Sequence, residues 1–309
     1  MTRLLIGYDG SEPARAAIAF AGSLFGTADA VVAHVHSPPP TMAAGRLARV
    51  ALPDTMIAEG IAGLRRQAES EGREKTDEGV ELARAAGLRA EPALRFALSP
   101  WRELRSLAEA NRADVVVCGT AGEGPVGRAM LGSTASSLLH HAEIPLLVVP
   151  GGPVALDGPL VVGFDGSEGS RAALRFAAGH LTNTRLLVAH AWRSPVRHSI
   201  RGHALTGSGV SSLEDYADSI DGIWTDVARE IAQDGTALAT ELGLDARPLS
   251  PESGHSTWRT LLAAAQEAGA AAVLVGSRGR GAATATLLGS VTSGLVHAAA
   301  LPVLVVPDR

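Results

Sequence analysis

Two glycine-rich segments share a spacing that could hold a phosphate group. In the first, Gly119, Gly122 and Gly132-Ser133 leave nine residues between the second glycine and the Gly-Ser pair. Glycines after a strand let several backbone N–H groups approach an anion, because no Cβ blocks them. The serine lies where a helix should begin, and the free N–H groups there favour phosphate. The second segment repeats the spacing with Gly276, Gly279, Gly289 and Ser290.

An alternative is that these glycines only form turns and the serines only cap helices. Glycine patterns often occur without a ligand, but two copies with one internal spacing favour the phosphate interpretation. The sequence contains no Gly-x-x-x-x-Gly-Lys-Ser/Thr motif, and its only lysine, Lys75, is far from both segments. The residues therefore favour nucleotide binding over rapid phosphoryl transfer.

Other landmarks repeat at nearly the same distance as the glycines. Asp9 and Asp165 both follow an apolar run and precede Gly-Ser-Glu, 156 residues apart (165 − 9). His34 and His190, in VVAHV and LLVAHA, are also 156 residues apart (190 − 34). A nearly constant offset indicates that the chain is a tandem duplication.

The boundary between the two copies falls in the turn-rich segment Pro-Gly-Gly-Pro at 150–153. A chain of 309 residues suits two ordinary domains better than one. We therefore expect one domain at 1–152 and a second at 153–309.

Short apolar runs alternate with helical patterns in each copy. This alternation predicts a parallel sheet with helices on both faces, and right-handed crossovers make it a doubly wound α/β sandwich. In the first copy we expect strands at 3–8, 30–36, 88–97, 114–118 and 145–149, and helices at 12–25, 54–86, 100–111 and 133–142. In the second copy we expect strands at 159–164, 185–191, 244–249, 271–275 and 302–306.

These elements would bring the aspartates and the glycine segments together. Ligands of such sheets bind outside the carboxyl ends of the strands, where the winding reverses. Asp9 and Asp165 end the first strand of each copy, and the glycine segments follow the fourth. If those strands are neighbours, a nucleotide fits with its base or ribose on the aspartate and its phosphates on the loop. The alternative is that each aspartate only orients the turn into the first helix.

The irregular segments 37–52 and 193–210 follow the second strand on the same side of the sheet. They could cover the crevice, as long loops often do. The histidines at 34 and 190 show no recurring metal-like spacing, so we expect them to be structural. Cys118 stands where the second copy has Val275, which favours a buried apolar role.

Charge and composition exclude several classes of partner. The formal net charge of −5 removes the electrostatic case for nucleic-acid binding. The single cysteine excludes an intramolecular disulfide. Apolar runs are too short to cross a membrane. A strand-like run follows Met1-Thr2-Arg3 at once, leaving no secretory signal, so we expect a cytoplasmic protein.

The two glycine segments differ in charge. The second carries Arg278 and Arg280, which could meet phosphate through charge-assisted hydrogen bonds, whereas the first has Ala121 and Glu123. Our hypothesis is that the second copy binds nucleotide more tightly. Replacing both residues of the first copy with arginine should then raise its affinity.

The chain resembles the universal stress protein family twice, over nearly its whole length, in the form of a tandem two-domain member. The resemblance rests on the frame Gly-x₂-Gly-x₉-Gly-Ser/Thr and on the strand endings IGYDGSE and VGFDGSE. It implies an adenine nucleotide alpha hydrolase-like, Rossmann-like fold, with each domain a five-stranded sheet of order 3-2-1-4-5. It also implies ATP as the ligand, with Mg²⁺ held by the phosphates. The residues themselves offer no general base aimed at a terminal phosphate, so we assign no catalytic residue.

The resemblance also implies a role for each site residue. The aspartates would contact the adenine or ribose side, the backbone of Val35 and Ala191 would lie near the base, and the glycines and serines would hold ribose and phosphates. The family's Gly-Ser-Val-Thr continuation is intact only in the second copy. The predicted nucleotide-binding residues are Gly7, Asp9, Val35, Gly119, Gly122, Gly132, Ser133 and Thr134, then Gly163, Asp165, Ala191, Gly276, Arg278, Gly279, Arg280, Gly289, Ser290, Val291 and Thr292.

Members of this family commonly dimerise through the last strand. We expect the two copies to pair in this way within one chain, through LLVVP and VLVVP, because apolar edge strands are usually covered. Whole chains could in addition pair into a homodimer, which the sequence does not decide. The expected function is that of an ATP-binding regulator in stress response. The alternatives are a slow ATPase or nucleotidyl-transfer enzyme, and a scaffold whose loops bind nothing or another adenine nucleotide such as cyclic AMP.

Overall fold

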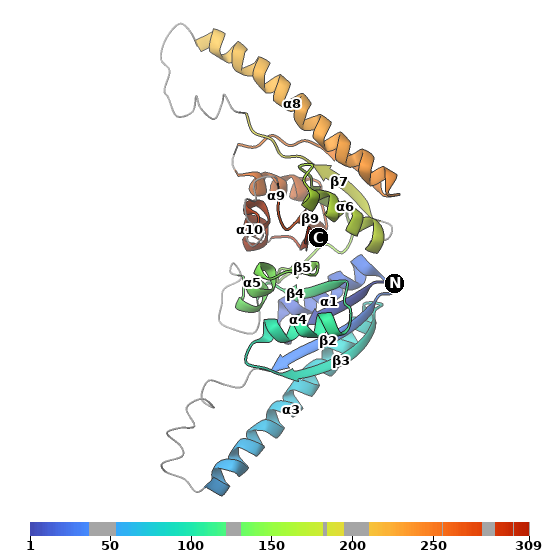
Figure 1. Ribbon diagram of the computed structural model, residues 1–309, viewed down its shortest axis with the longest axis vertical. Helices are drawn as coiled ribbons and strands as arrows, with labels where there is room; N and C mark the ends of the chain where they lie inside the picture. The colour runs from blue at the N-terminus through green and yellow to red at the C-terminus, as the bar shows by residue number, and fades with distance from the viewer. Residues whose placement is uncertain are drawn as a thin grey trace. The chain divides into compact units, whose positions relative to one another are not determined.

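The computed structural model divides the chain into two compact units, Met1–Pro153 and Val154–Arg309, which are described separately below (Figure 1). The predicted cover segments at 37–52 and 193–210 lie largely outside the described residues. Side chains at 54–62, 64–65 and 210–217 also lie outside the description. The described residues are 1–36, 54–121, 131–181, 184–194, 210–254, 256–279, 288–298 and 300–308.

Strands and helices alternate in both units, as the sequence predicts. The first unit contains β1 (Arg3–Gly7), α1 (Glu12–Phe25), β2 (Asp29–His36), α3 (Asp54–Ala85), β3 (Arg89–Phe96), α4 (Pro100–Ala110), β4 (Val115–Gly119), α5 (Ser133–His140) and β5 (Leu146–Val149). The second contains β6 (Leu160–Gly163), α6 (Glu168–His180), β7 (Arg185–Ala189), α8 (Val210–Glu241), β8 (Asp245–Leu249), α9 (Thr257–Glu267), β9 (Ala272–Gly276), α10 (Ser290–His297) and β10 (Val303–Val306).

Most element ends lie within one or two residues of the predicted ends. The α3 helix ends at Ala85 because Gly87 takes a φ of 89°, a left-handed conformation that closes helices. The α5 helix ends at His140 rather than at 142, since His141 already has a non-helical backbone.

The strands of each unit form a parallel sheet. The order is β3-β2-β1-β4-β5 in the first unit and β8-β7-β6-β9-β10 in the second. In the first unit, β1 lies between β2 and β4, and every neighbouring pair runs parallel. The second unit repeats these pairings around β6. The winding therefore reverses at β1 and at β6, which is where such sheets bind ligands.

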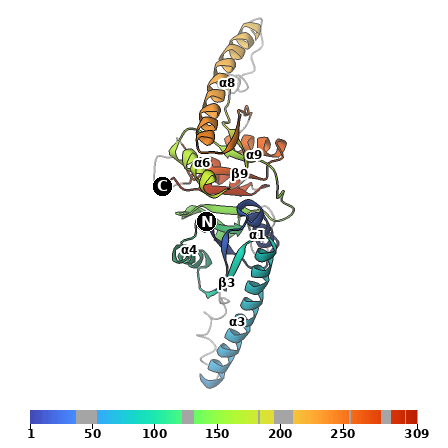
Figure 2. The ribbon, with the colours of Figure 1, turned by 90° about the vertical axis from the view of Figure 1, so that its right-hand side faces the viewer.

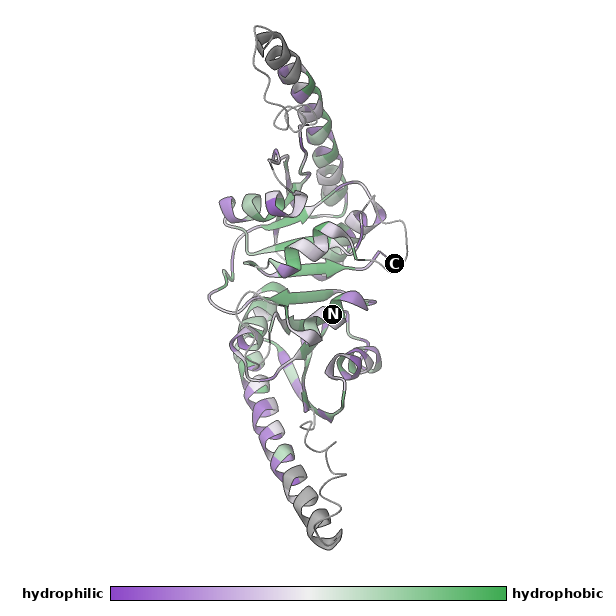
Figure 3. Ribbon diagram, turned by 90° about the vertical axis from the view of Figure 1, so that its left-hand side faces the viewer, coloured by the Kyte–Doolittle hydropathy of each residue, from purple (hydrophilic) through white to green (hydrophobic). Residues whose placement is uncertain are grey.

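Helices cover both faces of each sheet, which confirms the predicted α/β class. In the first unit α1 and α3 pack on one face, and α4 packs on the other (Figure 2). Helix α5 contacts α4 and β5 on that second face. In the second unit α6 and α8 take the place of α1 and α3. Strands β1, β4 and β5, like β6, β9 and β10, are almost wholly apolar (Figure 3), because both of their faces are buried, whereas the edge strands β3 and β8 carry exposed polar residues.

A matched contact joins the long helices to the sheets. A Cβ placed on Gly79 of α3 would lie 2.7 Å from Cδ1 of Tyr8, just beyond β1. A Cβ placed on Gly235 of α8 would lie 2.6 Å from Cδ1 of Phe164, just beyond β6. Only glycine lets each helix approach its aromatic ring so closely. The duplication is thus preserved in the packing as well as in the sequence.

The edge strands β3 and β8 each carry a proline at the same register. Pro92 lies opposite Val32, and Pro248 lies opposite Val188. Proline has no N–H, so it fits a strand whose outer edge donates no ladder bonds, and it discourages further pairing there. Among the described residues, no helix is both long and apolar enough to cross a membrane.

Candidate functional site

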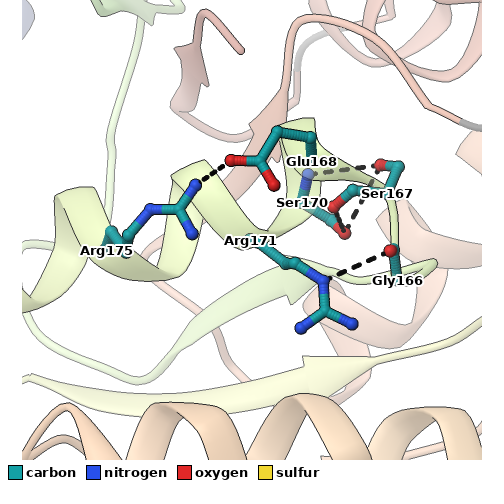
Figure 4. A network of polar contacts seen from close by, with 6 residues as sticks. All are labelled: Gly166, Ser167, Glu168, Ser170, Arg171 and Arg175. Carbon is teal, nitrogen blue, oxygen red and sulfur yellow. Dashed lines mark hydrogen bonds and ion pairs between the residues drawn. The ribbon is translucent and has the colours of Figure 1, made fainter. Parts of the chain in front are cut away.

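Each predicted aspartate forms a turn between the first strand of its unit and the following helix. Oδ1 of Asp9 accepts a hydrogen bond from the N–H of Ser11 at 3.0 Å, and Oδ1 of Asp165 accepts one from the N–H of Ser167 at 2.9 Å. The two serines then cap helices α1 and α6; Figure 4 shows the Ser167 cap. Each aspartate therefore does orient the turn into the first helix of its unit, the alternative considered from the sequence. This bond uses Oδ1 of the carboxylate.

The first glycine of each frame serves helix packing. A Cβ on Gly119 would lie 2.6 Å from Cβ of Pro13 and 2.8 Å from its carbonyl carbon. A Cβ on Gly276 would lie 2.5 Å from the carbonyl carbon of Gly169. These close neighbours belong to the first turns of α1 and α6. The sequence interpretation assigned both glycines to the approach of an anion, whereas the structure gives a steric reason for them.

The loop that contains the nine-residue spacing is closed in the same way in both units. The N–H of Gly132 donates to the carbonyl of Thr120 at 2.6 Å, and the N–H of Gly289 donates to the carbonyl of Ser277 at 2.9 Å. In both units these bonds join the end of the fourth strand to the start of the last helix. Within the loops, 122–130 and 280–287 lie outside the described residues, and so do the predicted site residues Gly122 and Arg280.

The last helix of each unit begins without a side-chain cap. Gly132 and Gly289 are the N-cap residues of α5 and α10, and neither helix has a side-chain hydrogen bond at its cap. Ser133 and Ser290 are the first helical residues, as the sequence indicates. The N–H groups of the first turn therefore keep their capacity to bind an anion, and the helix dipole favours negative charge there.

In the first unit these features meet in one cavity of about 300 Å³ at the carboxyl ends of β1, β2 and β4. Every described residue that was predicted for this copy lines it: Gly7, Asp9, Val35, Gly119, Gly132, Ser133 and Thr134. The prediction missed Tyr8, Ala14, Ala33, His34, Pro100, Leu104, Cys118, Thr120, Ala121 and Ala135. Most of these are chain neighbours of predicted residues, which is the signal that could have identified them.

Val35 directs its backbone groups toward this cavity. The carbonyl of Ala33 accepts from the N–H of Tyr8 and so points toward β1, while the carbonyl of His36 accepts from Ala97 beyond β3. Backbone groups of a parallel strand alternate in direction, so Val35 points its N–H and C=O toward the β1 side. Because β1 ends at Gly7, no strand of the described residues meets them there. These groups can pair with the edge of a planar base.

The same alternation applies to Ala191 in the second unit. The carbonyl of Ala189 accepts from Phe164, and the N–H of His190 donates to Leu249 on the opposite side. Ala191 therefore points toward the β6 side, beyond Gly163 where β6 ends.

The strand-two histidines tie the strand to the turn that holds the aspartate. Nδ1 of His34 lies 2.8 Å from the carbonyl of Tyr8, and Nδ1 of His190 lies 2.8 Å from the carbonyl of Phe164. A carbonyl only accepts, so Nδ1 carries the proton in both rings. Burial lowers the pKa of His34 and favours the neutral ring. These bonds fit the structural role expected from the sequence.

In the second unit the aspartate and the glycine loop lie against each other. A Cβ on Gly279 would lie 2.6 Å from Oδ2 of Asp165. The crevice inferred from the strand order therefore brings the carboxylate to the loop. A side chain at 279 would occupy the space beside this carboxylate.

Arg278 has a partner that the sequence did not suggest. Its Nε donates to Oδ1 of Asp308 at 3.0 Å, and its Nη2 contacts the same oxygen. The two side chains are 25% and 20% exposed. To contact a phosphate as predicted, Arg278 would have to leave or share its ion pair with Asp308, which follows β10.

Thr292 of the second unit is 3% exposed, and its hydroxyl donates to the carbonyl of Gly276 at 2.7 Å. It fastens α10 to the end of β9. The first unit has Ala135 at this place, while Thr134 lines the cavity. Val291 lies beside Thr292 in the first turn of α10.

Comparisons with known proteins agree with the resemblance seen in the sequence. A model of the universal stress protein family matches residues 1–150 and again 158–307. A universal stress protein of Mycobacterium tuberculosis (strain ATCC 25618 / H37Rv) is 29% identical over 245 residues, which cover 77% of each chain. A second one from this strain is 26% identical over 310 residues, covering 98% of this chain and 95% of that protein. A solved universal stress protein from Archaeoglobus fulgidus DSM 4304 is 19% identical, with a TM-score of 0.63 over 99% of this chain and 98% of its own.

Proposed function

Because this chain belongs to the universal stress protein family, we propose that each unit binds an adenine nucleotide, ATP with Mg²⁺, at the carboxyl ends of its strands. The observation that carries the proposal is the cavity of the first unit. It collects seven predicted positions from four separate segments of the chain in one place. It also lies where the sheet reverses its winding.

The two ends of the cavity suit different parts of a nucleotide. At one end, the backbone of Val35 can hydrogen-bond the edge of the base, and Asp9 can accept hydrogen bonds from the ribose hydroxyls. At the other end, the uncapped first turn of α5 offers N–H groups to the phosphates. Within the described parts of the chain, no three His, Cys, Asp or Glu side chains form a metal site. The phosphates would therefore supply the ligands of Mg²⁺.

We infer that the protein acts as a nucleotide-dependent regulator. Among the described residues that line the cavity, Asp9 is the only carboxylate, and none is lysine or arginine. Rapid phosphoryl transfer normally uses a cation on the transferred group and a positioned base. These residues favour holding a nucleotide over turning it over. Slow ATP hydrolysis is the second candidate function.

We propose that the second unit binds ATP more tightly than the first. Arg278 supplies a cation beside the loop, where the first unit has Ala121. Contacts between Arg and phosphate are charge-assisted and stronger than those of neutral donors. Thr292 also fixes α10 to the strand, so the phosphate-binding turn of this unit is more firmly held.

We also propose that the two units pair through their last strands. Within its own unit β5 is bonded to β4, and β10 is bonded to β9. Each keeps a second edge with an apolar sequence, LLVV or VLVV, and edges of this kind are usually covered. Hydrogen exchange on the full chain should show both strands as protected as β4 and β9. Rapid exchange along β5 would count against this pairing.

Titration calorimetry with ATP and Mg²⁺ on nucleotide-free protein tests the binding proposal. Two sites per chain are expected. Asp9→Asn and Asp165→Asn should each weaken one site by roughly 10- to 100-fold, because a hydrogen bond to a charged group contributes about 1.5–3 kcal/mol. Asparagine keeps an oxygen for the N–H of Ser11 or Ser167, so the turn is retained.

The matched control is Asp245→Asn, which replaces an exposed carboxylate at the start of β8. It should leave both sites unchanged. Absence of ATP binding to the wild-type protein would overturn the proposal and favour a scaffold. Tighter binding of cyclic AMP than of ATP would change the ligand assignment. Steady phosphate release that Asp165→Ala abolishes would favour the enzyme.

A further inference from the structure

Helix α8 presents three large apolar side chains to solvent. Ile223, Trp224 and Val227 are 63%, 46% and 40% exposed. Ile223 and Val227 are one helical turn apart, and Trp224 lies beside them, so the three share one face. We call this face the α8 surface. Its residues are separate from the stripe that packs on the sheet, which includes Ala228, Ala232, Gly235 and Ala239.

The duplicated helix α3 provides an internal comparison. At the positions 156 residues earlier it has Gln67, Ala68 and Glu71. There, Nε2 of Gln67 donates to Oε1 of Glu71 at 2.9 Å, as expected for a solvated helix face. Helix α3 thus packs on its sheet with a polar face at this place. The apolar residues of α8 are therefore not needed for folding, and a cluster of exposed apolar residues marks a binding surface.

The border of the α8 surface is acidic. Glu230 and Asp234 follow Ile223 and Val227 along the same row of the helix, and both are exposed. Within the described ranges of the chain, neither carboxylate forms an ion pair. In the first unit the counterpart of Asp234 is Glu78, which pairs with Arg15 of α1 at 2.8 Å.

The corresponding arginine of the second unit is directed elsewhere. Arg171 donates through Nε to the carbonyl of Gly166 (Figure 4), and its guanidinium lies 5.9 Å from the ring centre of Phe164. It therefore leaves Asp234 without the partner that Glu78 has. The α8 surface combines an apolar centre with a border whose two carboxylates form no ion pair with the described residues.

We propose that the α8 surface docks an amphipathic helix of a partner protein that carries lysine or arginine along one side of its apolar stripe. The apolar stripe of such a partner helix would cover Ile223, Trp224 and Val227. Trp is among the residue types that most often anchor an interface. The acidic border selects a basic partner. Two copies of α8 would bring like charges together, which disfavours a second copy of this chain as the occupant. This docking does not depend on nucleotide binding.

The test uses the full chain and a fluorescently labelled 18-residue amphipathic helix made of leucine and lysine. A peptide with glutamate in place of lysine is the charge control. The key variant carries Ile223→Gln, Trp224→Ala and Val227→Glu, the residues that α3 has at these positions. We expect fluorescence anisotropy to show at least tenfold weaker binding of the Leu/Lys peptide to this variant. The wild-type protein should bind the Leu/Glu peptide at least tenfold more weakly.

The matched control is Gln233→Ala with Thr240→Ala, two exposed positions elsewhere on α8, and it should bind like the wild type. Circular dichroism checks that every variant is folded. The key variant gains a negative charge, so nonspecific attraction would tighten its binding to the basic peptide. Equal binding to wild type and key variant would overturn the docking surface, and equal binding of both peptides would overturn the charge assignment. Self-association of the wild type that the key variant abolishes would assign the surface to a second copy.

Discussion

Replacing Gly276 with alanine should destabilise the second unit. An added Cβ would lie 2.5 Å from the carbonyl carbon of Gly169 and 2.6 Å from its oxygen, where ordinary contacts begin at 3.4 Å. These neighbours are backbone atoms in the first turn of α6, so no side-chain rotation can relieve the overlap. The helix or the strand end must move instead.

The size of the effect follows from this geometry. Overpacking of a well-packed site typically destabilises by about 1–3 kcal/mol, and a contact with rigid backbone belongs at the upper end. We therefore expect a loss of about 3 kcal/mol. For a unit of this size, that corresponds to a fall in Tm of about 6–12 °C. Gly222→Ala on α8 is the matched control, because no atom lies within 4 Å of an added Cβ there. It should gain up to about 1 kcal/mol from helix propensity.

Urea unfolding followed by circular dichroism measures the change, and hydrogen exchange assigns it to the second unit. Amides of β9 and α6 should lose protection, while those of β1 and β4 keep it. An unchanged urea midpoint would refute the steric account of the first glycine. If ATP binding were lost at that unchanged midpoint, the original interpretation, close approach of an anion, would be the better one.

Three further predictions follow from single groups. Asp308→Asn removes the carboxylate that neutralises Arg278, so calorimetry should show that the second unit binds ATP about 2- to 5-fold more tightly. Its affinity for adenosine, which has no phosphate, should not change. Weaker ATP binding would contradict this prediction. Burial lowers the pKa of His34 below its ordinary 6.5, so the stability it contributes is present above pH 6.5 and is lost as pH falls through the folded pKa, by at most about 1.4 kcal/mol per pH unit. His34→Asn, which keeps a donor for the carbonyl of Tyr8, should therefore make the urea midpoint depend less on pH between about pH 7 and pH 5. An unchanged pH dependence of the midpoint would argue against His34 as its source. Burial raises the pKa of Cys118 to about 12, so the folded protein should resist thiol reagents at about pH 8 and react rapidly in urea, and equal rates would contradict its burial.

Much of the site could be predicted from local patterns because the chain contains two copies. Asp9 with Ser11 and Gly132 with Ser133 recur with the same neighbours, and each pair acts through bonds to nearby residues. The family resemblance is confirmed by the match to both halves of the chain. The roles of the glycines were harder to predict, since a glycine in a sequence does not reveal which atom approaches it.

The sequence by itself determined the duplication, the alternation of strands and helices, and the resulting parallel sheets, because hydrophobic periodicity and turn residues act over a few positions. Only the tertiary structure decided that Gly276 meets Gly169, that Arg278 pairs with Asp308, and that Ile223 of α8 is left exposed. These relations depend on strand order and helix placement, which bring together or separate residues far apart in the chain. No local pattern carries that information.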